Sequence, residues 1–195
     1  MDFGKVKANL EKHHFAVKTF DTAAEAGDYI AGAIKGETIG FGGSVTLQDM
    51  GLYEKLEAGN TVIWHWKDPK NRDRYPEFTA YVTSVNAIAE TGEMINIDGS
   101  GNRLAASLFG PKKIYFVAGR NKITPDLASA IERARQIASP PNNKRLNMAN
   151  PCTKSGKCHD CNSPNRICNA LCIYMRPMST TDHTEVILVD EDLGY

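Results

Sequence analysis

The stretch ETIGFGGSVTLQDMGLYEKLEAG, residues 37–59, reads in order as a strand, a glycine-rich turn and a helical segment. Residues 37–41 fit a short buried strand that runs directly into the turn. The apolar residues that follow recur at spacings that fit one face of a helix, namely Val45, Leu52 and Leu56. Gly51 should weaken or break this helix. A strand that turns directly into a helix is typical of α/β sheets.

The other segments of residues 1–140 continue this alternation of strands and helices. Thr22 and Glu25 form a capping-box pattern that opens a helix ending at Gly36. Thr124 fits the N-cap of a second helix, which the prolines at 140 and 141 should end. Strands are expected at residues 14–20, 61–66, 81–89, 94–97 and 112–119. Together these segments predict an α/β fold with an open, mostly parallel sheet flanked by helices.

All five cysteines of the 195-residue chain lie within one stretch of 21 positions. Four of them have a C-x5-C-x2-C-x6-C spacing that can gather four sulfurs at one metal centre, namely Cys152, Cys158, Cys161 and Cys168. A [4Fe–4S] cluster tolerates one C-x2-C step combined with longer gaps. Structural zinc usually takes two such steps, and free or oxidised thiols are a third possibility. Cys172 falls outside the spacing, and we treat it as a spare thiol.

The formal net charge is zero, so no overall field favours nucleic acid or an anionic membrane as a partner. The charges are nevertheless unevenly distributed. Residues 141–178 carry six Lys or Arg side chains and one acid, whereas the last 17 residues carry five acids and no base. The basic stretch is also the one that contains the cysteines. Its cations would stabilise the net negative charge of four thiolates around a zinc ion or a cluster.

The cysteine-rich residues 149–178 fit an insertion within a single domain that spans residues 1–195. This part is polar and poor in apolar side chains, so it needs a staple to hold its shape. We expect one helix in it, at residues 163–175. The apolar residues 185–189 then return to the sheet. The sequence has no signal-peptide pattern and no run of membrane-spanning length, which predicts a cytoplasmic protein with reduced thiols.

The glycine-rich turn is a candidate site for a phosphate or a carboxylate. Glycines let backbone N–H groups approach an anion, and the following helix N-terminus adds partial positive charge. The turn lacks the third glycine of a dinucleotide fingerprint and the lysine of a Walker loop. A tight connection without any ligand remains the alternative. The candidate ligand-binding residues here are Gly40, Gly42, Gly43, Ser44 and Thr46.

Further polar residues follow other strands of the expected sheet. Glu90 ends an apolar strand and opens a turn, where it would serve as nucleophile or base, or only as a surface turn residue. Lys122 follows the strand at 112–119 and places a charge at the edge where open α/β sheets bind ligands. The other candidate ligand-binding residues near these loops are Asn86, Thr91, Gly92 and Asn102.

Five phrases carry a resemblance that extends over nearly the whole chain: GFGGSVTLQDMGL (40–52), SVNAIAETGEMINIDGSGNRLA (84–105), VAGRNKITPDLASAIERAR (117–135), SPPNNKRLN (139–147) and PCTKSGKCHDCNSPNRICN (151–169). Through them the sequence resembles the LUD domain family of lactate utilisation proteins, in particular a small branch with a cysteine-rich segment. The resemblance implies a fold like that of the ribose-5-phosphate isomerase and CoA transferase group, with the ligand site by the glycine turn. It also implies a link to bacterial oxidation of lactate to pyruvate beside iron–sulfur proteins. The four cysteines of that branch match Cys152, Cys158, Cys161 and Cys168.

Three functional hypotheses follow. The first is a protein of lactate or 2-hydroxy-acid redox metabolism that carries a [4Fe–4S] cluster and binds a small anionic metabolite, with iron–sulfur oxidoreductases as partner proteins. The second is an isomerase or acyl-transferase-like enzyme with Glu90 as base or nucleophile and a structural zinc. The third is a non-enzymatic carboxylate-sensing or assembly subunit. A homo-oligomer is compatible with all three.

Overall fold

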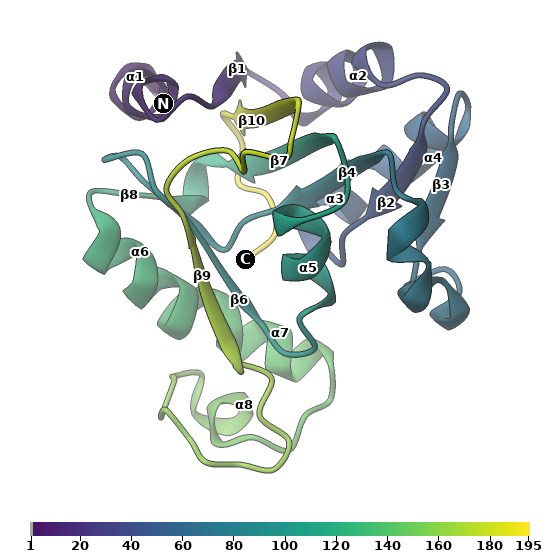
Figure 1. Ribbon diagram of the computed structural model, residues 1–195. Helices are drawn as coiled ribbons and strands as arrows, with labels where there is room; N and C mark the ends of the chain where they lie inside the picture. The colour runs from purple at the N-terminus through teal and green to yellow at the C-terminus, as the bar shows by residue number, and fades with distance from the viewer. Residues whose placement is uncertain (1) are drawn as a thin grey trace.

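The computed structural model describes residues 2–195 and is built around a six-stranded sheet (Figure 1). Every neighbouring pair of strands in this sheet is parallel. The strand order is β1 (Ala16–Phe20), β10 (His183–Val189), β7 (Lys113–Gly119), β4 (Ala80–Ser84), β2 (Thr38–Phe41) and β3 (Thr61–Trp64). The expectation of an open, parallel α/β sheet flanked by helices is confirmed.

The side chains of β7 alternate between two hydrophobic cores, one on each face of the sheet. Tyr115 and Val117 belong to the core under α2 (Ala23–Ala33), α3 (Val45–Asp49) and α4 (Leu52–Glu57). Ile114 and Phe116 belong to the core under α1 (Gly4–Lys12) and α5 (Asn102–Leu108). Successive side chains of a strand point to opposite faces, so a central strand covered on both sides is apolar throughout.

A second sheet of four short strands lies against the first, in the order β8 (Ile123–Thr124), β5 (Ala87–Ala89), β6 (Met94–Asp98) and β9 (Ala170–Tyr174). The expectation of one strand over residues 81–89 was therefore wrong, because β4 and β5 belong to different sheets. Asn86 makes the break between them. Its N–H donates to the carbonyl of Ile95, and its side-chain oxygen accepts from the N–H of Ile97 at 2.8 Å. These bonds turn the chain away from β7, the partner of β4, and toward β6, the partner of β5.

Two helix signals in the sequence act as expected. Thr22 caps α2, and Glu25 completes a reciprocal capping box. Gly51 has a φ of 59°, a left-handed conformation that favours glycine, and it divides the predicted helix into α3 and α4. The sequence therefore marks both the start of one helix and the break of another.

Two predicted helix boundaries were wrong. Thr124 lies in β8, and the N-cap of α6 (Leu127–Arg133) is Asp126, whose carboxylate accepts from the N–H of Ser129 at 2.8 Å. The prolines at 140 and 141 begin α7 (Ser139–Arg145) instead of ending a helix. A π-helical turn over residues 134–138 widens the helix just before them. Proline is tolerated there because a first helical turn does not use those N–H groups.

The cysteine-rich segment forms a lobe between α7 and β9, at the bottom of Figure 1. It contains the short α8 (Pro151–Ser155), but the helix predicted at 163–175 does not form: residues 163–169 are turn and irregular structure, and strand β9 follows. Pairing of β9 with β6 explains this difference, because Asp98 is the register partner of Ala170 and draws the chain into the second sheet.

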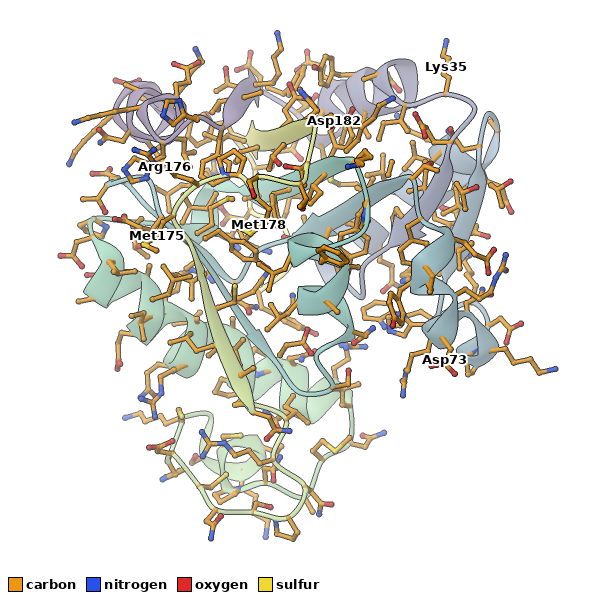
Figure 2. All side chains as sticks on the ribbon, viewed as in Figure 1. Lys35, Asp73, Met175, Arg176, Met178 and Asp182 are labelled. Atoms are coloured by element: carbon orange, nitrogen blue, oxygen red, sulfur yellow. The ribbon has the colours of Figure 1, made fainter. Side chains whose placement is uncertain are left out.

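The segment after β9 carries Met175, Arg176 and Met178 and leads back to β10 (Figure 2). Two 3₁₀ segments complete the described elements, η1 (Pro69–Glu77) and η2 (Arg120–Lys122). None of the helices formed by residues 2–195 is long and apolar enough to cross a membrane.

Candidate functional site

A cavity of about 1090 Å³ opens at the carboxyl-terminal edge of the six-stranded sheet. Its wall is formed by the segments that follow β2, β3, β4 and β7, together with α5, α7 and the loop before β9. After β2 the chain runs to β3 on one side, whereas after the neighbouring strand β4 it returns to this sheet as β7 on the other side. Such a switch in strand order leaves a crevice at the carboxyl ends, where open α/β sheets bind their ligands.

The side chains that line this basic cavity carry an excess of positive charge. Its Lys and Arg residues are Lys67, Arg72, Arg103, Lys122, Arg145 and Arg166, against one carboxylate side chain, that of Asp98. That carboxylate is already engaged, since it accepts from two backbone N–H groups and from Arg103 at 3.4 Å. A concave surface lined by one sign of charge concentrates ligands of the opposite sign. The cavity therefore suits an anion.

Aromatic side chains hold one of these cations in place. The rings of Trp64 and Trp66 stack at a centroid distance of 5.2 Å, and the guanidinium of Arg145 lies 4.4 Å from the centroid of Trp66. His65 lies between these two tryptophans in the sequence. Burial lowers the pKa of its imidazole, and the charges of Arg72 and Arg145 lower that pKa further. The imidazole is therefore kept neutral in a positively charged wall.

Lys122 lies at the floor of the basic cavity and is 4% exposed. Its Nζ donates to Oγ1 of Thr46 at 2.7 Å, to Oγ of Ser84 at 2.9 Å and to the carbonyl of Val85 at 3.1 Å. These partners follow β2 and β4, the two strands at the switch. One buried amine therefore ties together the loops that frame the crevice.

The structure brings together six of the residues that the sequence suggested for ligand binding. Gly43, Ser44, Thr46, Asn86, Asn102 and Lys122 all line the basic cavity. Ser44 also caps α3, since its hydroxyl accepts from the N–H of Leu47. Gly40 and Gly42 do not line the cavity but allow close packing. A Cβ at Gly40 would lie 2.1 Å from the ring of Phe78, and one at Gly42 would lie 2.4 Å from Oγ1 of Thr83.

The remaining candidates, Glu90, Thr91 and Gly92, lie apart from the basic cavity, in a turn beside α1. The carboxylate of Glu90 pairs with Lys5 at 2.6 Å, and the side chain of Asn9 donates to the carbonyl of Glu90. A Cβ at Gly92 would lie 2.9 Å from the carbonyl oxygen of Asn9. This turn anchors the N-terminal helix, so the structure gives Glu90 a packing role and no access to the cavity.

A second cavity, of about 250 Å³, is lined by all four cysteines of the spacing pattern: Cys152, Cys158, Cys161 and Cys168. We call it the thiol cavity. Burial raises the pKa of Cys152, and the charges of the other three thiols raise it further, so all four are within electrostatic reach. Cys172 lies on β9 and does not line the thiol cavity. No disulfide links the five cysteines in the described chain.

Among residues 2–195, no group of three or more His, Cys, Asp or Glu side chains is placed so that it could hold a metal ion. A [4Fe–4S] cluster spreads its thiolate ligands over the corners of a cube, further apart than the ligands of one ion. The four thiols around the thiol cavity are ligands of the type that a cluster or a zinc ion takes.

Cations surround the thiol cavity. Hydrogen bonding to Cys158 and the charge of Asp160 raise the pKa of Arg135. Arg166 donates to the carbonyls of Cys161 at 2.7 Å and of Cys168 at 2.9 Å, and it pairs with Asp160 at 3.0 Å. These contacts orient the loop and place positive charge where four thiolates would be negative.

The two cavities share a wall. Arg166, Ile167 and Cys168 line both of them, together with Ile97 and Ser139. Gly99 permits this approach, because a Cβ there would lie 2.8 Å from the carbonyl oxygen of Ile167. A ligand in the basic cavity would therefore be separated from a group in the thiol cavity by one short segment of chain.

The sequence model of the LUD domain family matches residues 4–189. The chain belongs to the LUD domain family. Its fold is similar to that of a DUF162 family protein from Deinococcus radiodurans, known from a crystal structure. The TM-score is 0.57 with 15% sequence identity, over 95% of this chain and 94% of that one. No curated protein matches the sequence.

Sequence reasoning missed several residues that this LUD domain brings to the basic cavity. Arg72 lies in η1, Arg145 at the end of α7 and Arg166 in the loop before β9. Trp66 was expected only as a strand residue, although it holds Arg145. Arg103 lies in the first turn of α5, next to the predicted candidate Asn102. Arg72 and Arg103 follow β3 and β6, a position that could have drawn attention to them, whereas Arg145 and Arg166 follow helices and have no such signal.

Proposed function

We propose that this protein takes part in redox metabolism of lactate or similar 2-hydroxy acids, with the acid in the basic cavity and a [4Fe–4S] cluster on Cys152, Cys158, Cys161 and Cys168. Membership of the LUD domain family supports a protein of the lactate-utilisation type. The observation that carries the finer proposal is the wall that the two cavities share, Arg166 to Cys168.

The basic cavity supplies what a small hydroxy acid needs. Arginines offer paired N–H donors that match a carboxylate, and Arg103 and Arg145 both line the cavity. The hydroxyls of Thr46 and Ser84 face the same floor and suit a neighbouring hydroxyl or carbonyl group. Recognition therefore combines charge at the walls with hydrogen bonding at the floor.

The thiol cavity supplies what a cluster needs. Cysteine thiolates are the usual ligands of such clusters, and a bound cluster supplies a one-electron carrier or a staple for the polar lobe. Arg135 and Arg166 would hold the thiolates in their charged form. The backbone N–H of Asp160 also points at Sγ of Cys158, at 3.4 Å, as a donor to a coordinated sulfur.

The proposed role also has consequences for the cellular compartment and for the partner proteins. A reducing cytoplasm would keep the five thiols available for a cluster. Electrons that leave a lactate-type substrate need an acceptor, so iron–sulfur oxidoreductases are the expected partners. The rival enzyme with Glu90 as base gains no support, because Glu90 pairs with Lys5 outside both cavities.

The test is a ligand titration of protein purified without oxygen. L-lactate and pyruvate are added separately, and binding is followed by calorimetry while cluster absorption is followed in the visible region. The proposal predicts saturable binding and a change in the visible bands when the cavity fills. Binding of either acid without any visible chromophore would favour the carboxylate-sensing alternative.

A matched pair of variants makes the test specific. Arg145→Gln removes a cation of the basic cavity, whereas Arg176→Gln removes a cation from the segment after β9, outside both cavities. Affinity for the acid should fall about tenfold in the first variant and stay unchanged in the second. Equal affinities in both variants would remove the basic cavity from the proposal.

A further inference from the structure

Lys122 is buried at the floor of the basic cavity, and the proposed redox role assigns it no function. Its three hydrogen-bond partners are two hydroxyls and a carbonyl, and no carboxylate of residues 2–195 forms an ion pair with it. Buried lysines are ordinarily paired with an acid, because an isolated ammonium loses its hydration. An unpaired lysine at a cavity floor is a pattern associated with chemistry.

The surroundings let this amine lose its charge close to neutral pH. Burial, followed by the charges of Arg133 on α6 and Arg103 on α5, lowers the pKa of Lys122 to about 7, and Asp49 on α3 opposes the shift. The uncharged amine can donate only two of these three hydrogen bonds, and its electron pair accepts the third from the hydroxyl of Thr46 or Ser84. Once that hydroxyl turns away, the electron pair is a nucleophile toward carbonyl carbon. Lys67, which also lines the cavity, has a different environment, since it is exposed and pairs with Glu54.

We infer that Lys122 captures small 2-oxo acids as a reversible imine at the floor of the basic cavity. This activity goes beyond the proposed redox role and needs no cluster. The geometry that carries it is an amine 4% exposed, lining a cavity of about 1090 Å³ and bracketed by the hydroxyls of Thr46 and Ser84.

The chemistry balances without a co-reactant. The nitrogen of Lys122 adds to the carbonyl carbon, and one proton moves from nitrogen to the former carbonyl oxygen. The carbinolamine then loses that oxygen as water and leaves a carbon–nitrogen double bond. One water is released for each imine formed, and nothing is oxidised or reduced. Thr46 and Ser84 lie at 2.7 and 2.9 Å from Nζ, close enough to relay the proton.

Arg103 explains the preference for an acid. Its Nε and Nη2 hold Asp98, Asn86 and the carbonyl of Ile97. Within the described chain, Nη1 of Arg103 has no hydrogen-bond partner, and the side chain is 15% exposed on the cavity wall. A carboxylate next to the reacting carbonyl would use this donor. Neutral ketones and aldehydes lack that contact.

Reductive trapping tests the inference directly. The protein is incubated with pyruvate and sodium cyanoborohydride at pH 7.5, and peptides are mapped by mass spectrometry. We expect one reduced adduct per chain, at Lys122, with labelling on the order of a hundredfold faster than at exposed lysines, whose amines stay protonated. Acetone, a ketone without a carboxylate, should label Lys122 at least tenfold more slowly.

Two variants keep the test decisive. Lys122→Arg keeps a long hydrogen-bond donor at the cavity floor but cannot form a stable imine, so specific labelling should disappear while circular dichroism shows an intact fold. Lys18→Arg, an exposed lysine on β1, should label as the wild type does. Adducts scattered over surface lysines, or equal labelling of Lys122→Arg, would overturn the inference. Neither result would touch the cluster proposal, which has a separate readout in iron content.

Discussion

Nε of Arg166 donates a hydrogen bond of 2.9 Å to the backbone carbonyl of Cys168, and both residues line the basic cavity and the thiol cavity. This one contact joins the two parts of the site. Arg166 also holds Cys161 and Asp160, so a single side chain orients half of the cysteine ligands proposed here. A substitution of Arg166 should therefore affect both cavities.

Replacement of Arg166 by alanine should loosen the lobe and expose the thiols. We expect Arg166→Ala to lower the iron content of protein purified without oxygen by at least half. Its visible bands should bleach several-fold faster in air, because three anchoring hydrogen bonds are lost. Arg176→Ala is the control and should match the wild type, because this basic residue lies beyond the end of β9 that points away from the lobe (Figure 2). Equal bleaching rates in the two variants would argue against the role of Arg166.

Gly99 should not tolerate a side chain, because the shared wall approaches it closely. Its Cβ would lie 2.8 Å from the carbonyl oxygen of Ile167, a backbone atom that cannot swing away. Gly99→Ala should lower the free energy of unfolding by about 1–3 kcal/mol in a urea titration. Gly32→Ala, on the exposed side of α2 with no atom within 4 Å, should raise it by about 0.5–1 kcal/mol. Unchanged stability in Gly99→Ala would mean that the wall is not closely packed.

Lys122 should make stability depend on pH. Because its folded pKa is lowered to about 7 from 10.5, the folded chain binds fewer protons than the unfolded chain between these values, and stability rises with pH across that window. The full cost, on the order of 5 kcal/mol, applies below pH 7. Lys122→Met removes this titration, so the variant should gain on the wild type by about 3 kcal/mol more at pH 6 than at pH 9. Urea unfolding at both pH values measures the difference, and a constant difference would contradict the uncharged amine.

Glu90 provides a test of where the ligand lies. Since its carboxylate pairs with Lys5 on the half-exposed surface beside α1, we expect Glu90→Gln to bind L-lactate and pyruvate as the wild type does. The loss of an exposed ion pair should change stability by less than about 1 kcal/mol. Calorimetry decides the question. A large loss of affinity in Glu90→Gln would move the ligand site to the turn at residues 90–92.

The sequence predicted the parts of the fold that depend on local patterns. The capping box at Thr22, the break at Gly51 and the apolar strand 185–189 all follow from residues close together in the chain. The second sheet was missed because it depends on side-chain bonds of Asn86 to residues of β6, which no periodicity reports. The prediction that the prolines at 140 and 141 end a helix was wrong because a π-helical turn before them lets the helix continue.

The candidate site was predictable to a similar extent. Ser44, Thr46 and Lys122 follow strands, and the rule that parallel strands present ligand sites at their carboxyl ends places them together. Arg145 and Arg166 escape that rule, since they come from α7 and from the lobe, which only the folded chain brings back over the sheet. The proximity of the two cavities is a property of the tertiary structure alone.

Quantification of iron, acid-labile sulfide and zinc in protein isolated without oxygen tests the central proposal most directly, in the wild type, Cys161→Ser and Cys172→Ser. The proposal predicts about four iron and four sulfide per chain in the wild type and in Cys172→Ser, because Cys172 lies outside the thiol cavity. It predicts at most a small residue of iron in Cys161→Ser. Iron-free wild-type protein, or equal iron in all three, would contradict it.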